Sequence, residues 1–163
     1  MRETRLKPRL RSAQAHRLCK IYKCNCPRLW GADICTTPSV LAEYRAGVTS
    51  GLLPPDAWAH LPLLTPTEKE ASFAASLPPR LGAGERSCLA IAVHRQGLLV
   101  SDDLDARHVA QRHGIPITGM VGILVLCVRR GDLSRDQAGA LLVEMRGFGY
   151  RSPVVSLDSL LDG

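Results

Sequence analysis

Four carboxylates stand at positions where the fold of the chain would gather them around a cation. Asp102 and Asp103 directly follow the apolar run 98–101, while Glu85 and Glu43 belong to helices expected before it. Ligands of open α/β sheets bind just outside the carboxyl ends of strands, and carboxylates that converge there repel one another unless a cation joins them. Because hard oxygen ligands suit Mg²⁺ or Mn²⁺, the placement predicts a divalent-metal site.

Each acid also has an ordinary structural explanation. The dipole of a helix stabilises an acid in its first turn, which is the place expected for Glu85. Asp102 or Asp103 would cap the helix expected to begin at Leu104, and Glu43 would lie on a solvated helix face. These explanations account for the acids one by one and leave their grouping unexplained.

The elements that would position these acids alternate between helices and short apolar strands. The first half of the chain predicts a weak helix at 13–22, a strand at 32–35, a helix at 39–46 capped by Thr37 and stopped by Gly47, a short helix at 57–60 and a helix from Thr67 to Leu77.

The second half of the chain repeats this alternation with sharper signals. It predicts a helix at 85–95 ended by Gly97, a strand at 98–101, a helix at 104–113, an edge strand at 115–118, a largely buried helix at 120–130, a helix from the Ser134–Gln137 capping box to Arg146, and an extended piece at 153–155. The expected strands are continuous apolar runs, which favours an α/β fold with a small, mostly parallel sheet flanked by helices.

The net charge of +6 is concentrated at one end of the chain. The 163 residues, 45% hydrophobic and 22% charged, fit one ordinary domain and exclude collagen-like, coiled-coil and disordered classes. Residues 1–30 hold nine Lys or Arg and one acid, whereas residues 31–163 hold twelve basic and fourteen acidic residues. We therefore separate an atypical basic segment, 1–30, from a slightly acidic domain, 31–163. The segment is either an RNA-binding arm or sequence foreign to the domain.

The six cysteines predict a reduced, cytoplasmic protein. Cys88 and Cys127 lie in apolar helical runs, where a free thiol acts as a small hydrophobic side chain. Four residues of segment 1–30 are potential zinc ligands, although their spacing matches no common zinc knuckle: His16, Cys19, Cys24 and Cys26. The apolar runs are too short to cross a bilayer, and the basic start lacks the apolar core of a signal peptide, so we expect no membrane partner.

The order and spacing of several segments resemble the PIN-domain family. The most similar branch is that of VapC-like toxins, which carry a GE-x-x-x-(I/L)-A-x-A helix followed by an S/T-D-D-x-x-A-R step from strand to helix. Here the first motif runs from Gly84 to Ala92 and the second from Ser101 to Arg107. Similar segments lie at 37–43, 117–124, 131 and 147–149, so the resemblance covers residues 33–155 approximately.

The resemblance implies a metal-dependent endoribonuclease, usually the toxin of a toxin–antitoxin pair. Carried over by motif, Glu43, Glu85 and Asp103 would be the metal ligands. They would hold one or two Mg²⁺ or Mn²⁺ ions that activate water for attack on an RNA phosphodiester. Asp102 would be an adjacent catalytic helper.

The resemblance also implies groups around these ligands and partners for the whole protein. Thr36 or Ser101 would orient a carboxylate or a water. Arg107 would contact the scissile phosphate or brace the carboxylates, with bracing slightly preferred because it lies in a helix. RNA is the implied substrate, an antitoxin protein is a possible partner, and the family resemblance implies a homodimer.

The beginning of the chain departs from the family pattern. The family opens with a central strand that ends in Asp, well before the helix glutamate. Counting back from Glu43 reaches residues 3–11, which contain no apolar strand and no Asp, and Asp33 stands too close to Glu43 to replace it. Either residues 1–10 stand in place of the central strand because the start is truncated or misassigned, or a diverged PIN fold has lost its first metal ligand.

Two main functions follow from this departure. The first is the metal-dependent ribonuclease itself. The alternative is a catalytically impaired PIN-like module that binds an antitoxin or RNA without cutting it. A more distant alternative is a zinc-stabilised, basic nucleic-acid binder.

Overall fold

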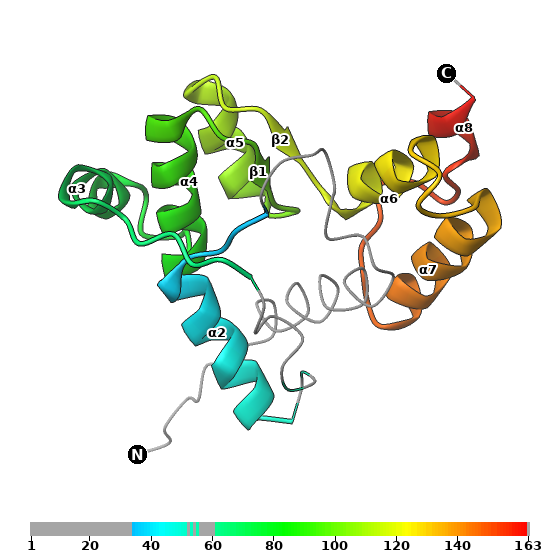
Figure 1. Cartoon of the computed structure of the whole chain (residues 1–163), viewed down its shortest axis with the longest axis horizontal. Helices are drawn as coiled ribbons and strands as arrows, with labels where there is room; N and C mark the ends of the chain where they lie inside the picture. The colour runs from blue at the N-terminus through cyan, green and yellow to red at the C-terminus, as the bar shows by residue number, and fades with distance from the viewer. Residues whose placement is uncertain (1–33, 52, 54, 56–60, 163) are drawn as a thin grey trace, which may run out of the picture.

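The computed structural model describes residues 34–51, 53, 55 and 61–162 as helices alternating with short strands (Figure 1). The elements are α2 (Pro38–Thr49), α3 (Glu68–Ser76), α4 (Ala83–Arg95), β1 (Leu99–Val100), α5 (Leu104–Arg112), β2 (Ile117–Thr118), α6 (Met120–Arg129), α7 (Arg135–Gly147) and α8 (Asp158–Leu161). The basic segment 1–30 with its potential zinc ligands, the helices expected at 13–22 and 57–60, and Asp33 lie outside the described residues.

The two strands pair in parallel and form a small sheet. Leu99 pairs with Ile117 and Val100 pairs with Thr118, and α5 makes the crossover between the strands. A parallel pair requires a crossover of this kind. The fold is therefore α/β with a small parallel sheet and surrounding helices, as the sequence predicts.

Strand β1 joins two hydrophobic clusters. Leu99 packs into a cluster formed with α3, α4 and α5, and Val100 packs against a cluster of α6, α7 and the C-terminal segment. Figure 1 shows the same division, with α6, α7 and α8 on one side of the strands and α2 to α5 on the other. Successive strand residues face opposite ways, so a strand buried on both faces needs the continuous apolar run that the sequence contains.

Side-chain caps begin three helices where the sequence predicts them. Thr37 caps α2 by accepting a hydrogen bond from a backbone N–H of the first turn. Thr67 and Glu70 form a capping box on α3, and Ser134 and Gln137 form another on α7. Each box satisfies two backbone N–H groups, which explains why these local signals succeeded.

Two glycines that we expected to end helices do not. Helix α2 continues past Gly47 to Thr49. A Cβ on Gly47 would lie 2.5 Å from Cδ1 of Leu53, so this glycine lets the following loop pack against the helix. Helix α4 ends at Arg95, and its C-cap, which adopts the left-handed conformation with φ 53°, is Gln96 rather than Gly97.

Two predicted extended segments are not strands. The described residues of 32–35 belong to no strand, and a parallel bridge begins only at Thr36, which is opposite Leu63. The piece at 153–155 forms no strand either. Pro153 has no N–H to donate, and the N–H of Val154 is bound by the hydroxyl of Ser152 at 3.2 Å.

Candidate active site

The connection between α4 and β1 brings two acidic segments toward the same edge of the sheet. Helix α4 packs against β1 and leads into it through a short turn, so helix and strand run in opposite directions. The beginning of α4, with Glu85 in its first turn, therefore lies toward the edge at which β1 ends. Asp102 and Asp103 come shortly after that end.

The carboxylate of Asp102 is held at the N-terminus of α6. Its two oxygens accept from the backbone N–H of Met120 at 3.2 and 3.3 Å. Its Oδ1 also accepts from the hydroxyl of Tyr150 at 3.2 Å. The N-cap residue of α6, Gly119, makes no side-chain cap. Asp102 supplies that cap from another element, and the helix dipole stabilises its negative charge.

Gly119 allows Asp102 and Arg107 to approach the backbone closely. A Cβ at this position would lie 2.1 Å from Asp102 Oδ1 and 2.6 Å from Arg107 Nη2, which is far inside van der Waals contact. The guanidinium of Arg107 and the carboxylate of Asp102 therefore border the same small space above Gly119. This placement suits a bracing role for Arg107.

Asp103 caps the following helix, α5. Its Oδ1 accepts from the backbone N–H of Ala106 at 2.8 Å, and its own N–H donates to the hydroxyl of Ser101 at 3.2 Å. Ser101 is buried, so its hydroxyl helps to fix the turn that carries Asp103. The two adjacent aspartates thus serve two different helices, which the sequence alone did not resolve.

Glu43 reaches from α2 to the first turn of α4. Its Oε1 accepts from the backbone N–H of Gly84 at 3.1 Å, and the N-cap of α4, Gly82, makes no side-chain cap. Glu43 is half-buried, so the explanation that it lies on a solvated face is wrong. Gly84 is followed directly by Glu85, itself half-buried with its Oε2 buried. The contact therefore brings Glu43 to the turn that carries Glu85.

The Thr36–Thr37 pair fixes the start of α2, the helix that carries Glu43. Thr36 is buried, and its backbone donates to Pro62 O at 3.0 Å and accepts from Leu64 N at 2.8 Å. The side chain that reaches α4 is the neighbouring Thr37, whose Oγ1 lies 2.6 Å from the buried hydroxyl of Ser87. The sequence singled out Thr36, whereas the hydroxyl that meets α4 in the structure is that of Thr37.

Carboxylate oxygens are suitable ligands for a hard divalent cation. Among the described residues, however, too few of them come together to hold one. Glu43, Asp103 and Asp102 each bind the N-terminus of a different helix, namely α4, α5 and α6. Within residues 34–51, 53, 55 and 61–162, no group of three or more His, Cys, Asp or Glu side chains is arranged to hold a metal ion. The described residues alone therefore do not make a complete metal site.

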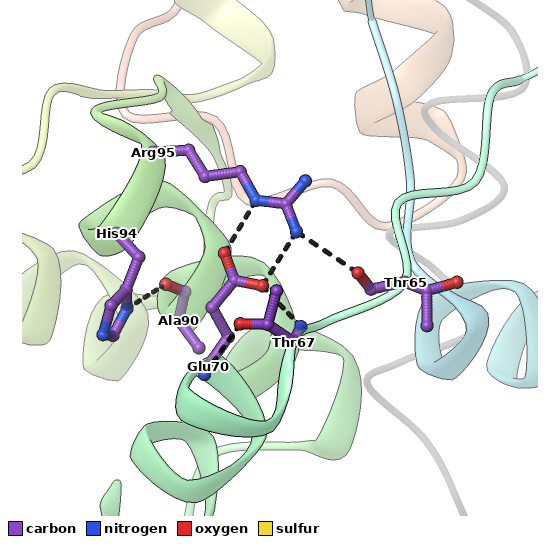
Figure 2. Close-up of polar contacts among 6 residues, drawn as sticks. All are labelled: Thr65, Thr67, Glu70, Ala90, His94 and Arg95. Atoms are coloured by element: carbon purple, nitrogen blue, oxygen red, sulfur yellow. Dashed lines mark hydrogen bonds and ion pairs between the residues drawn. The ribbon is translucent and has the colours of Figure 1, made fainter.

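An ion pair between the buried Glu70 and the exposed Arg95, which the sequence did not reveal, joins α3 to α4 (Figure 2). Glu70 accepts from Arg95 Nε at 2.7 Å and from Arg95 Nη2 at 2.8 Å, and the same Nη2 donates to Thr65 O at 3.2 Å. The hydrogen bonds from Arg95 and from the Thr67 backbone lower the pKa of Glu70 to about 2. Glu70 as a whole residue is only 2% exposed. Its partner lies 25 residues away, so the sequence signal that could have found Glu70 is the capping-box spacing after Thr67.

The thiol of Cys88 lies on the side of α4 that faces the start of α2. Burial raises the pKa of Cys88 to about 11, although hydrogen bonds with Thr37 and Ser87 lower it. A thiol of this kind is unreactive at neutral pH. Cys88 and the fully buried Cys127 therefore fill space, as the sequence predicts.

The fold and the acidic edge together define an α/β domain of the nuclease type. The chain belongs to the PIN-domain family, because a family model described as a PIN domain matches residues 17–162. That range includes part of the basic segment 1–30. Domains of this family generally use divalent metal ions, and the family suggests RNA binding. Searches of curated proteins and of solved structures gave no match. No helix among the described residues is long and apolar enough to span a membrane.

Proposed function

We propose that this protein is a metal-dependent endoribonuclease of the VapC-like branch, acting in the cytoplasm as the toxin of a toxin–antitoxin pair. One observation carries the proposal. The contact from Glu43 to Gly84 brings one carboxylate to the turn that bears another, Glu85. The same edge of the sheet receives Asp102 and Asp103 after β1. Acids on helix α4, beside it on α2 and after β1 are the residue types that the family's chemistry uses.

In this proposal Glu43, Glu85 and Asp103 are the metal ligands. A bound Mg²⁺ or Mn²⁺ ion would supply an activated water for hydrolysis of an RNA phosphodiester. The residues of the chain orient the acidic groups. The hydroxyl of Ser101 holds the turn of Asp103, and the backbone pairing of Thr36 holds the start of the helix that carries Glu43.

Asp102 and Arg107 complete the acidic edge. Asp102 is the helper beside the ligands, fixed at the start of α6. Arg107 borders the same space at Gly119, and in this proposal it braces the carboxylate. A guanidinium in this position also offsets the repulsion between neighbouring acids.

A cleavage assay on structured RNA with Mn²⁺ tests the proposal. Wild type should cleave, and Glu85→Gln or Asp103→Asn should abolish cleavage while keeping the fold. Asn caps helices as well as Asp does, so Asp103→Asn preserves the start of α5. Glu68→Gln, which removes an exposed acid from α3, is the matched control and should cleave like wild type. Equal cleavage by all four proteins would refute the assignment of the site.

A second candidate is a PIN-like module that binds RNA or an antitoxin without cutting. The observation that favours it is the use of Glu43, Asp103 and Asp102 as helix caps. These caps account for three of the four acids without any reaction. If wild type binds RNA or a co-expressed antitoxin but leaves RNA intact with Mn²⁺, this candidate replaces the first. Sedimentation of the purified protein would test the expected homodimer.

A further inference from the structure

Tyr150 reaches the acidic edge from the far end of the chain. Its hydroxyl donates to Asp102 Oδ1 at 3.2 Å, across 48 residues of sequence. Neither the PIN-like motifs nor the spacing of the acids pointed to this residue. The contact joins the segment after α7 to Asp102, in the turn that follows β1.

Contacts other than the hydroxyl hold the ring of Tyr150 in place. Tyr150 is 5% exposed and belongs to the same hydrophobic cluster as Leu142 and Met145. Its backbone N–H donates to Met145 O at 3.0 Å. Gly149 precedes it with φ 85°, a left-handed conformation that favours glycine and turns the chain back toward α7. The direction of the hydroxyl is therefore set by packing and by the turn.

The hydrogen bond from Met120 does not distinguish the two oxygens of Asp102. The backbone N–H of Met120 lies almost equally far from both oxygens, at 3.2 and 3.3 Å. A donor shared between two oxygens does not select one orientation of the carboxylate. The Tyr150 hydroxyl contacts one oxygen, Oδ1, and so distinguishes the two.

We propose that Tyr150 is a positioning residue of the acidic edge, which holds the Asp102 carboxylate in one orientation through its hydroxyl. The proposal rests on the ribonuclease function proposed above. Tyr150 acts through Asp102 and does not contact RNA. It also makes the orientation of this acid depend on the docking of the segment that follows α7.

Tyr150→Phe in the full chain tests the proposal, because it removes the hydroxyl and keeps the ring. Tyr44→Phe is the matched control, since Tyr44 is equally buried but lies in a separate cluster with Leu53. With Mn²⁺ and RNA, Tyr150→Phe should lower kcat about 10-fold and leave KM within about twofold, because a misplaced carboxylate affects the reaction more than substrate binding. The control should match wild type in both constants.

A double-mutant cycle separates this proposal from the function on which it rests. Tyr150→Phe should lower the melting temperature of wild type but have no further effect in an Asp102→Ala background. Additive shifts would overturn the link between the two residues. Unchanged kcat in Tyr150→Phe would overturn the positioning role, even with a coupled shift in melting temperature. If wild type does not cleave RNA, the proposed function and the catalytic part of this proposal both fail, and the cycle still decides the contact.

Discussion

Gly119→Ala gives the sharpest test of how the acidic edge is built. The backbone of Gly119, with φ −121° and ψ −173°, is extended, and any residue adopts it without strain. The effect of the substitution is therefore purely steric. The added methyl group would lie 2.1 Å from Asp102 Oδ1 and 2.6 Å from Arg107 Nη2. The guanidinium ends a flexible side chain and moves aside, whereas Asp102 is tied in place.

The geometry sets the size of the effect. A carbon and a carboxylate oxygen in contact lie about 3.3 Å apart, so Oδ1 must retreat by roughly 1 Å. Its hydrogen bonds from Met120 N and from the Tyr150 hydroxyl, both 3.2 Å long, would then exceed hydrogen-bonding distance. We expect a loss of about 2 kcal/mol in the free energy of unfolding, within the usual cost of overpacking. For a chain of this size the melting temperature should fall by about 4–8 °C.

Thermal and urea unfolding of the full chain measure this loss. Gly139→Ala is the matched control, because nothing lies within 4 Å of a Cβ at that position of α7. Alanine in an open helical site should stabilise the protein by about 0.5–1 kcal/mol. The cost of Gly119→Ala should shrink in an Asp102→Ala background. Equal melting temperatures for wild type and Gly119→Ala would refute the placement of Asp102 at the start of α6.

Two further predictions concern groups away from the acidic edge. Hydrogen bonding to Arg95 lowers the pKa of Glu70 to about 2, below its ordinary 4.5, so the ion pair contributes stability that is present above pH 4.5 and is lost as the pH falls toward 2. Urea unfolding should therefore show Glu70→Gln less stable than wild type at pH 7, with the difference shrinking below pH 4.5. The raised pKa of Cys88 should make its alkylation by iodoacetamide at pH 8 about 100-fold slower than that of an ordinary thiol.

Each of these predictions has an internal control. Glu68→Gln changes an exposed acid in the same first turn of α3 and should leave the unfolding curves close to wild type. A stability difference for Glu70→Gln that is the same at pH 7 and pH 3 would contradict the ion-pair argument. For the thiols, the exposed Cys35 provides the comparison by peptide mapping. Equal labelling of Cys35 and Cys88 would show that the Cys88 thiol is not protected.

Local chemistry made much of the fold predictable. The caps at Thr37, Thr67 and Ser134 begin helices whatever packs around them, because a side-chain oxygen satisfies a backbone N–H of its own helix. The same reasoning failed at Gly47. There a tertiary contact with Leu53, and not the end of a helix, requires the missing side chain.

The candidate site also has a part that the sequence predicts and a part that depends on packing between distant segments. The place of Asp102 and Asp103 after β1 follows from the topology of parallel sheets, and the sequence predicts it. Which helix each acid caps depends on packing between distant segments, as does the contact of Asp102 with Tyr150 across 48 residues. No local pattern encodes that contact. Sequence reasoning therefore predicted the acids together with Ser101 and Arg107, and missed Tyr150, which contacts Asp102.

The use of Glu43, Asp103 and Asp102 as helix caps has an evolutionary consequence. Replacing any of them with a residue that has no side-chain acceptor removes a fold contact as well as a charge. Selection for folding alone would therefore retain these acids in a lineage that had stopped cleaving RNA. An inactive descendant would keep the acidic signature of its active ancestor, and the signature would be lost late. Exchange for Asn or Gln, which keeps a hydrogen-bond acceptor and discards the charge, is then the substitution that marks a lineage released from catalysis.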